Sequence, residues 1–225
     1  MSIELKKRIF TSIILFFIMF YMYNYNYVLI SSLILISAIL WIEFNLIISK
    51  IFKKKNFKNS FLYFLLKFSS LIYISFFSII VWLSFNQNLD YSEKTFYLYI
   101  LFVCIFTDIG GMIFGKLFKG PKLTKISPNK TVYGSAGSLI SSFILMTIFY
   151  LYITNIDLFY LFIITLSVSL SSQLGDLFIS FLKRKAKIKD TSNLLPGHGG
   201  LLDRLDGILI GLPIGFTTSN LIIIL

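Results

Sequence analysis

The sequence predicts an all-α fold, a polytopic bundle of about seven transmembrane helices with a cytoplasmic N-terminus. Of the 225 residues, 56% are hydrophobic and only 14% are charged, whereas about a quarter of the residues are charged in a typical soluble domain. The apolar residues form long unbroken runs that lack the polar–apolar alternation of a membrane β-barrel. The expected spans are residues 9–23, 27–48, 61–85, 96–116, 135–153, 157–182 and 206–225.

Polar and basic residues bound these spans. Lys6, Lys7 and Arg8 precede the first span, which ends in the Tyr- and Asn-rich stretch 23–27. Because no small-residue cleavage site follows, we expect this span to be retained and not removed as a signal peptide. The later spans are joined alternately by basic and by short polar connections. The basic connections are 50–60, 116–134 and 183–205, and the short ones are about 24–26, 86–95 and 154–156.

The distribution of basic residues predicts the orientation of the bundle. The chain has 21 Lys and Arg against 10 Asp and Glu, a formal net charge of +11. Nineteen of the 21 lie in the N-terminal segment and the three basic connections. Since basic residues gather on the cytoplasmic side of membrane proteins, these segments are expected in the cytoplasm and the C-terminus outside. Membrane anchoring explains a charge that in a soluble protein would suggest nucleic acid, so no nucleic-acid partner is expected.

Three acidic residues lie inside apolar runs, namely Glu43, Asp108 and Asp176. A charge in lipid costs several kcal/mol, so such residues usually face protein or water and mark function. Each precedes the basic end of its span by seven or eight residues. At ~1.5 Å per residue, all three are expected roughly 10–12 Å below the cytoplasmic interface. The alternative is a structural role, such as pairing with a lysine.

The sixth span carries polar residues at spacings of three and four, which place them on one helical face. They are Ser169, Ser172, Asp176, Ser180 and Lys183. A packing face would explain the serines but not the aspartate. Small residues four apart on other spans predict close helix packing, which also leaves a homodimer open. They are Gly111 and Gly115, and Gly207, Gly211 and Gly215.

The segment that follows the sixth span combines cations, glycines and carboxylates. Its basic cluster, within 183–189, suits either membrane anchoring or phosphate binding. The turn at 196–200 is rich in glycine, which lets backbone N–H groups approach a phosphate. Asp203 and Asp206 would point the same way on a helix, and with Asp176 they could line a Mg²⁺ site. His198 is the only histidine, so a site that needs two or three histidine ligands is excluded.

Together these features suggest group transfer at a phosphate, on a Mg²⁺–nucleotide next to a lipid phosphate. The run Ser180-x-x-Lys183-Arg184-x-x-x-x-Lys189-Asp190, then Pro196-Gly197-His198-Gly199-Gly200 and Asp203-Arg204-x-Asp206, closely resembles the signature of the phosphatidate cytidylyltransferases, or CDP-diacylglycerol synthases. Gly175 and Asp176 also match. The stretch 127–134, with Ser127, Lys130 and Thr131, resembles the family's Ser-Pro-Lys-Lys-Thr-x-Glu-Gly loop, and Asp108 and Gly115 match the helix before it.

The resemblance covers about residues 105–207 and divides the chain. Residues 1–100 match the family only as hydrophobic spans, and 101–225 form an expected catalytic membrane region with the cytoplasmic loops 116–134 and 183–205. Three positions depart from the family pattern. Asn129 replaces a usual Lys, Tyr133 a usual Glu, and Gly207 a usual Ser. The loss of the Glu puts one carboxylate of the first loop in doubt.

The resemblance implies that CTP and phosphatidic acid react to give CDP-diacylglycerol and pyrophosphate, with Mg²⁺ as cofactor, in a bacterial-type cytoplasmic membrane with the active site facing the cytoplasm. It implies that the metal ligands are Asp176 and Asp203, with Asp206 nearby. The catalytic set comprises Asp176, Asp203, Asp206, Lys189, Asp190 and His198. The substrate-binding set comprises Ser127, Lys130, Thr131, Ser180, Lys183, Arg184, Gly199, Gly200 and Arg204.

Two other functions stay open. A related CTP-dependent lipid or polyprenol kinase would transfer the γ-phosphate, so its products would be a phospholipid and CDP. A transporter of an anionic substrate would explain the intramembrane carboxylates and the basic loops, but not the spacing of the signature.

Overall fold

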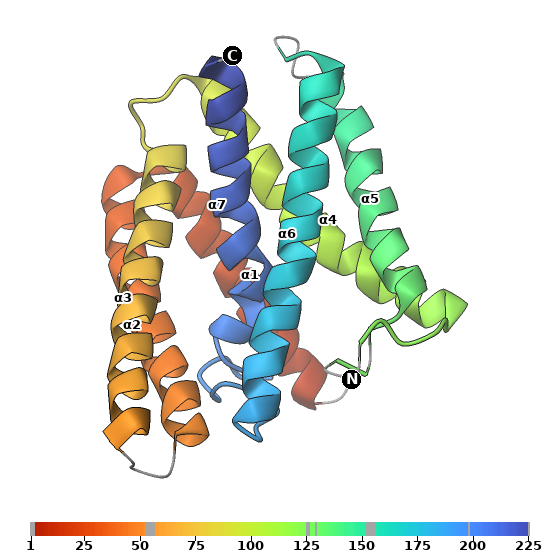
Figure 1. Cartoon of the computed structure of the whole chain (residues 1–225). Coiled ribbons are helices and arrows are strands. Elements are labelled where there is room, and N and C mark those ends of the chain that lie inside the picture. The colour runs from red at the N-terminus through yellow and green to blue at the C-terminus, as the bar shows by residue number, and fades with distance from the viewer. Residues whose placement is uncertain are drawn as a thin grey trace. The chain divides into compact units, whose positions relative to one another are not determined.

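A computed structural model of the chain describes residues 3–52, 57–124, 127–128, 130–151, 156–197 and 199–224. In these residues the structure is all helical, with two isolated β-bridges and no strand (Figure 1). The helices are α1 (Ile3–Asn24), α2 (Asn26–Ile51), α3 (Phe57–Phe85), α4 (Tyr91–Phe118), α5 (Val132–Tyr150), α6 (Leu158–Lys185) and α7 (Leu202–Ile224).

The helices have the lengths that a membrane requires. Within the described ranges, six helices, α2 to α7, are long and apolar enough to cross a bilayer, and α1 has a shorter apolar stretch, Phe10–Asn24. The predicted all-α polytopic bundle is confirmed. Several helices extend beyond their apolar runs, and α7 begins at Leu202 instead of near residue 206. Asp203 and Asp206 are therefore both helical, which was the condition for the two side chains to point the same way.

The chain packs as two compact units. Unit 1 comprises Met1–Asn88 and Leu182–Leu205, and unit 2 comprises Leu89–Phe181 and Asp206–Leu225. Unit 1 thus holds α1 to α3 and the connection from the end of α6 to the start of α7. Unit 2 holds α4, α5 and most of α6 and α7. The boundary predicted near residue 100 concerned similarity to a family, and it stays a prediction.

In unit 1, α2 packs against both α1 and α3. The packed face of α2 follows helical spacing, and its buried residues are Leu29, Leu33, Leu40, Glu43, Ile47 and Ile48. One hydrogen bond, between the Ser37 and Ser78 hydroxyls at 2.6 Å, joins α2 to α3. Glu43 is the one charged residue on this apolar face, so its carboxylate needs polar partners.

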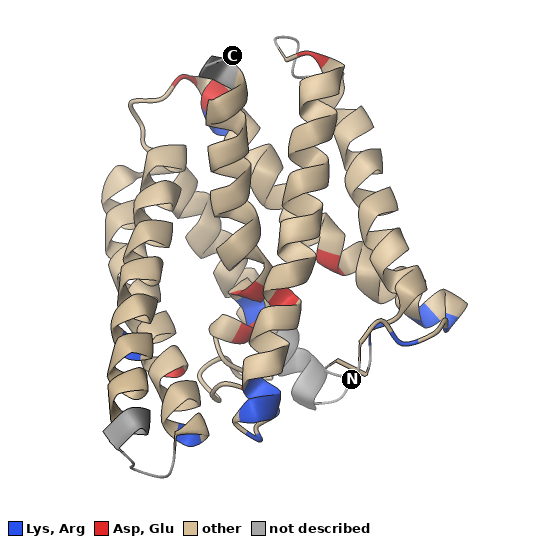
Figure 2. Ribbon diagram, in the orientation of Figure 1, with Lys and Arg blue, Asp and Glu red and all other residues tan. Residues whose placement is uncertain are grey.

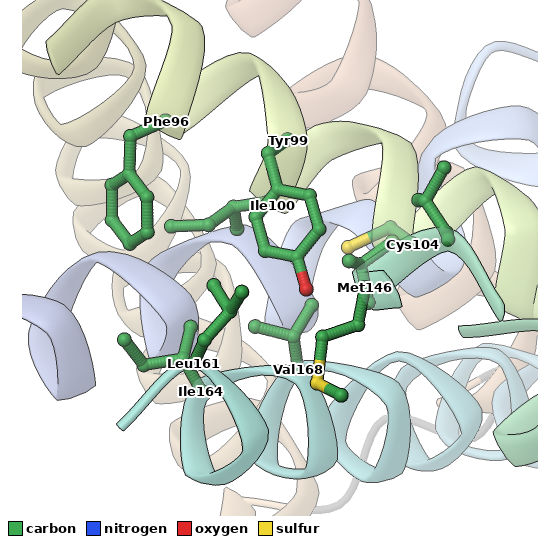
Figure 3. Close-up of a cluster of buried hydrophobic side chains, with 10 residues drawn as sticks. Phe96, Tyr99, Ile100, Cys104, Met146, Leu161, Ile164 and Val168 are labelled. Atoms are coloured by element: carbon green, nitrogen blue, oxygen red, sulfur yellow. The ribbon is translucent and has the colours of Figure 1, made fainter. Parts of the chain in front are cut away.

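In unit 2, the core lies between α4, α5 and α6 (Figure 3). Phe96, Tyr99, Ile100, Val103 and Cys104 recur at helical spacing along α4 and meet residues of the other two helices. Cys104 is fully buried in this cluster. The Tyr99 hydroxyl is satisfied by a hydrogen bond with Thr165.

Next to this core, three buried hydroxyls form a closed triangle. Thr107, Ser142 and Ser169 come from α4, α5 and α6, and each pair of their oxygens is 3.0 Å apart. Hydrogen bonds between helices replace the contacts with water that these groups lose in a membrane. The triangle explains part of the polar face of α6 as packing.

Glycines allow α7 to lie against its neighbours in unit 2. A Cβ atom on Gly211 would lie 2.6 Å from Cys104 Sγ, and one on Gly215 would lie 2.5 Å from Ile100 Cγ2. Real Cβ contacts are longer than this, so only glycine fits without a shift. The close packing predicted from the spacing of these glycines is confirmed.

Replacing Gly211 with Val is therefore expected to destabilise the protein by at least about 1–3 kcal/mol, since overpacking forces neighbouring side chains and backbone to move. The measurement is the unfolding midpoint in detergent. The matched control is Thr217→Val, an isosteric change at an exposed position of α7. Equal midpoints for the two variants would contradict the tight contact at Gly211.

Candidate active site

Charged residues mark where polar chemistry can occur in this apolar chain. Figure 2 shows Lys and Arg in the last turn of α6, where Lys183, Arg184 and Lys185 lie. The chain then leaves α6 and reaches α7 through residues 186–201. This connection, with the helix ends that bound it, is called the signature loop below.

The signature loop contains a glycine turn. Gly197 and Gly199 have φ angles of 78° and 81°, a region that L side chains rarely adopt. The Leu195 N–H donates a hydrogen bond to the Gly199 carbonyl at 2.8 Å and closes the turn. The positive φ angles of this turn therefore require glycine at positions 197 and 199. His198 lies outside the described residues.

Asp203, in the first turn of α7, is a centre of hydrogen bonding in unit 1. Its Oδ2 accepts from the Thr191 N–H at 2.8 Å, the Thr191 hydroxyl at 3.0 Å and the Gly200 N–H at 3.0 Å. Its Oδ1 accepts from Lys183 Nζ at 2.8 Å. Three predicted residues, Lys183, Gly200 and Asp203, therefore meet here. Because three donors occupy Oδ2, the atom with room for a further partner is Oδ1.

Glu43 reaches the same loop from α2. Its Oε1 accepts from the Ser192 hydroxyl at 2.6 Å and from the Leu201 N–H at 3.1 Å. Its Oε2 accepts from the Thr191 hydroxyl at 3.1 Å and from the Leu202 N–H at 2.8 Å. These four donors are neutral hydroxyl and backbone groups. The contacts of Glu43 therefore do not include the lysine that a structural ion pair would have required.

A second group of predicted residues meets in unit 2. Lys130 forms an ion pair with Asp176 of α6, and the Ser180 hydroxyl donates to Asp176 Oδ1 at 3.5 Å. About a quarter of each partner's side chain in this ion pair is exposed, 27% for Lys130 and 23% for Asp176. Both side chains are therefore partly accessible to a ligand.

Backbone hydrogen bonds hold Lys130 in place before α5. The Lys130 N–H donates to the Ser127 carbonyl at 3.0 Å, and the Leu123 N–H donates to the Lys130 carbonyl at 2.8 Å. The next residue, Thr131, caps α5 because its hydroxyl accepts from the Gly134 N–H at 3.0 Å. Ser127, Lys130 and Thr131 are thus parts of one folded loop.

Two of the three departures from the family pattern have a physical account. A Cβ atom on Gly207 would lie 2.5 Å from Ser172 Oγ, so a serine does not fit there without a shift. Tyr133 is exposed, and its ring lies 6.3 Å from that of Phe118, so an aromatic contact stands in place of a carboxylate. Asn129 lies outside the described residues.

The remaining predicted residues are spread over the surface and the helices. Arg184, Lys189, Asp190 and Arg204 are exposed. Asp206 is buried in α7, and its Oδ1 accepts from the Gly207 N–H at 3.0 Å. Among the described residues, no group of three or more His, Cys, Asp or Glu side chains could hold a metal ion by itself.

Sequence reasoning missed two residues that organise the signature loop, Thr191 and Ser192, and it singled out Glu43 without assigning it to this loop. Glu43 carried a signal as an acidic residue inside a span, but nothing in the sequence pointed to its partners. Thr191 and Ser192 are ordinary loop residues by sequence. Their role is visible only in their contacts with the two carboxylates.

Comparisons with known proteins identify the family. The chain matches the model of the cytidylyltransferase family over residues 2–222. A protein of Bacillus subtilis (strain 168) named phosphatidate cytidylyltransferase is 46% identical over 129 residues, which are 56% of this chain and 48% of the relative. Proteins of the same name from Rickettsia bellii (strain RML369-C) and Rickettsia felis (strain ATCC VR-1525 / URRWXCal2) are 44% and 41% identical over 137 and 144 residues.

These two matches cover 56% and 59% of this chain and 58% and 63% of the relatives. The alignments thus span about half to three fifths of the curated relatives. Together with the six long apolar helices, they indicate an integral membrane protein. Since the family model covers residues 2–222, this chain belongs to the cytidylyltransferase family.

Proposed function

We propose that the protein transfers the cytidylyl group of CTP to phosphatidic acid, giving CDP-diacylglycerol and pyrophosphate. The observation that carries the proposal is the pairing of two signature carboxylates with lysines, Asp176 with Lys130 and Asp203 with Lys183. Membership of the cytidylyltransferase family and the names of the similar proteins support CTP and phosphatidate as the substrates.

The proposed reaction needs little covalent chemistry from the protein. An oxygen of the lipid phosphate attacks the α-phosphorus of CTP, and the bond from that phosphorus to the pyrophosphate oxygen breaks in line. The attacking phosphate is already ionised, so no strong general base is required. Catalysis is then mainly positioning and electrostatic stabilisation, as in other phosphoryl-type transfers.

Basic and small polar side chains would bind the phosphates. Lys183 and Lys130 are each held by a carboxylate, so each ammonium is already placed where a phosphate can share it. Arg184 and Lys189 add exposed cations to the signature loop. The proposed substrate-binding residues are those of the sequence signature, namely Ser127, Lys130, Thr131, Ser180, Lys183, Arg184, Gly199, Gly200 and Arg204. Lys189, Asp190 and His198 are proposed to act next to them.

Mg²⁺ is the proposed cofactor, with Asp176, Asp203 and Asp206 as its candidate ligands. Carboxylates are hard oxygen donors, and Mg²⁺ is usually held by one or two of them together with substrate phosphates. Asp203 fits this role through Oδ1, the oxygen that faces Lys183. Asp176 fits it as a partly exposed carboxylate. When bound, the ion would neutralise charge on the α-phosphate and on the departing pyrophosphate.

The proposed site faces the cytoplasm of a bacterial-type inner membrane. Nineteen of the 21 basic residues lie in the segments assigned to that side, and basic residues favour the cytoplasmic face. CTP would enter from the cytoplasm, and the acyl chains of phosphatidic acid would stay in the lipid. A homodimer is compatible with this arrangement, and the purified protein's mass in detergent would measure it.

The test is product identification with detergent-purified protein, phosphatidic acid, Mg²⁺ and CTP labelled in either the α- or the γ-phosphate. The proposal expects α-label in CDP-diacylglycerol, γ-label in pyrophosphate, and loss of both products with a chelator. Transfer of γ-label to lipid with release of CDP would overturn it in favour of a kinase. Well-folded protein that gives neither product would also overturn it.

A further inference from the structure

We propose that Glu43 is a positioning residue for the reaction, acting from α2 through Thr191 and Gly200 on the carboxylate of Asp203. The expected effect of Glu43 on catalysis rests on the proposed function. The structural link from Glu43 to Asp203 does not. All the residues that carry it lie in unit 1.

Glu43 occupies a site built for a carboxylate. Only 2% of the residue is exposed, and burial of an ionised carboxylate is costly unless hydrogen bonds compensate it. Here each oxygen accepts one backbone N–H and one hydroxyl, at distances from 2.6 to 3.1 Å. This symmetric arrangement matches two equivalent acceptor oxygens and no other side chain of the same size.

The donors come from two parts of the signature loop. Leu201 immediately precedes α7 and Leu202 is its first residue, and N–H groups at a helix start have no partner within their own helix. Thr191 and Ser192 lie before the glycine turn. One carboxylate therefore caps α7 from another helix and ties its start to the chain that leaves α6.

The loop backbone lies directly against this carboxylate. A Cβ atom on Gly200 would lie 2.7 Å from both Glu43 oxygens and 1.9 Å from Thr191 Oγ1. Only glycine fits at this contact. Gly200 is one of the residues of the family signature, and its place here explains why the signature has no side chain at that position.

The link to Asp203 runs through shared groups. Thr191 Oγ1 lies 3.1 Å from Glu43 Oε2 and 3.0 Å from Asp203 Oδ2, and its single proton is shared between these two acceptors, so the one hydroxyl joins the two carboxylates. The Gly200 N–H, held next to Glu43, donates to the same Asp203 oxygen. Glu43 thus fixes the groups that orient Oδ2, and through them it sets the direction of Oδ1.

The inference gives the N-terminal helices a part in the chemistry. Glu43 lies in α2, outside the stretch of about 105–207 that carries the signature. The signature loop would depend on α2 for the geometry of Asp203, because Glu43 supplies the carboxylate that the N–H groups of Leu201 and Leu202 bind.

The test replaces Glu43 with Gln in the full chain. Gln keeps the size but offers one acceptor oxygen, and its amide NH₂ would face a backbone N–H of Leu201 or Leu202 that cannot accept a hydrogen bond. The matched control is Ser78→Ala, which removes a hydrogen bond to the same helix, α2, away from the loop.

We expect E43Q to lower kcat and raise the Mg²⁺ requirement by about 10–100-fold, as replacements behind a metal ligand do, with the KM for phosphatidic acid unchanged. S78A is expected to change neither quantity. A general loss of folded protein would lower the amount of active enzyme without changing its Mg²⁺ requirement. An E43Q variant with normal kcat and Mg²⁺ requirement would overturn the catalytic part of the inference.

Amide hydrogen exchange without substrates gives a readout apart from activity. E43Q is expected to speed exchange at Gly200, Leu201 and Leu202, whereas S78A is expected to leave it unchanged. Unchanged exchange in E43Q would overturn the structural link. If the wild type makes no CDP-diacylglycerol but E43Q still loosens these amides, the proposed function fails and the link stands.

A double variant tests the route. Because Thr191 carries the contact to Asp203, adding Thr191→Val to E43Q should lower kcat by much less than Thr191→Val does in the wild type. Fully additive effects of the two substitutions would contradict a route through Thr191.

Discussion

Replacing Asp176 with Asn is expected to reduce formation of CDP-diacylglycerol by at least about a hundredfold, since the loss of several kcal/mol of charge stabilisation corresponds to that factor. Asn keeps the size of the side chain but removes the charge that pairs with Lys130. The substitution would also replace a negatively charged ligand of the proposed Mg²⁺ ion with a neutral one. The partner ammonium, no longer neutralised, would bind phosphate without the metal that the reaction requires.

The measurement is the rate of label transfer from CTP to lipid across a range of Mg²⁺ concentrations. Expression and the unfolding midpoint should stay close to the wild type, because Asp176 is partly exposed and has one ion-pair partner. The matched control is Asp157→Asn, the same substitution next to the start of α6, where the side chain accepts the local backbone N–H of Phe159. Full activity of D176N would show that Asp176 holds no essential metal.

Replacing Asp203 with Asn is expected to lower both activity and stability. The carboxylate accepts four hydrogen bonds, three of them on Oδ2. An Asn side chain must turn its NH₂ either toward the N–H groups of Thr191 and Gly200 or toward the Lys183 ammonium. Either way a donor faces a donor, and the expected cost is about 1.5–3 kcal/mol, typical of a lost hydrogen bond to a charged group.

The loss of activity in D203N should again be at least about a hundredfold if Oδ1 is a metal ligand. The variant Lys183→Met separates the loss of activity from the loss of stability. It removes the ion pair with Asp203 Oδ1 and leaves the hydrogen bonds to Oδ2 in place. K183M should lose phosphate binding, seen as a raised KM for CTP, while keeping the order of the loop. Asp90→Asn, at the start of α4, is the control for a carboxylate at a helix start. A D203N variant as stable as the wild type would contradict the hydrogen bonds described for Oδ2.

The transmembrane helices and the residues of the family signature could be identified from the sequence alone. Hydrophobic length is a local property, so spans such as α2 and α3 can be found without knowledge of their neighbours. The spacing of Asp176, Ser180 and Lys183 likewise predicts one helical face. The glycine turn was predictable for the same reason, because a positive φ at Gly197 and Gly199 is a demand of the local backbone.

The ends of helices were less predictable than their centres. α7 begins at Leu202, four residues before the apolar run that marked it, because Glu43 and Asp203 satisfy the N–H groups of that first turn and of Gly200 just before it. A cap supplied from a different helix leaves no local pattern in the sequence.

Only the tertiary structure decided which charged and polar groups meet. Glu43 and Thr191 are 148 residues apart in the chain, and Lys183 and Asp203 are 20 apart, yet each pair is in hydrogen-bond contact. The sequence identified Glu43 as an acidic residue inside a span, with pairing to a lysine as one alternative to a functional role. The structure supplies hydroxyl and backbone donors instead. The physical reason is that apolar composition determines which segments enter the membrane, whereas the partner of a buried charge depends on which helices pack together.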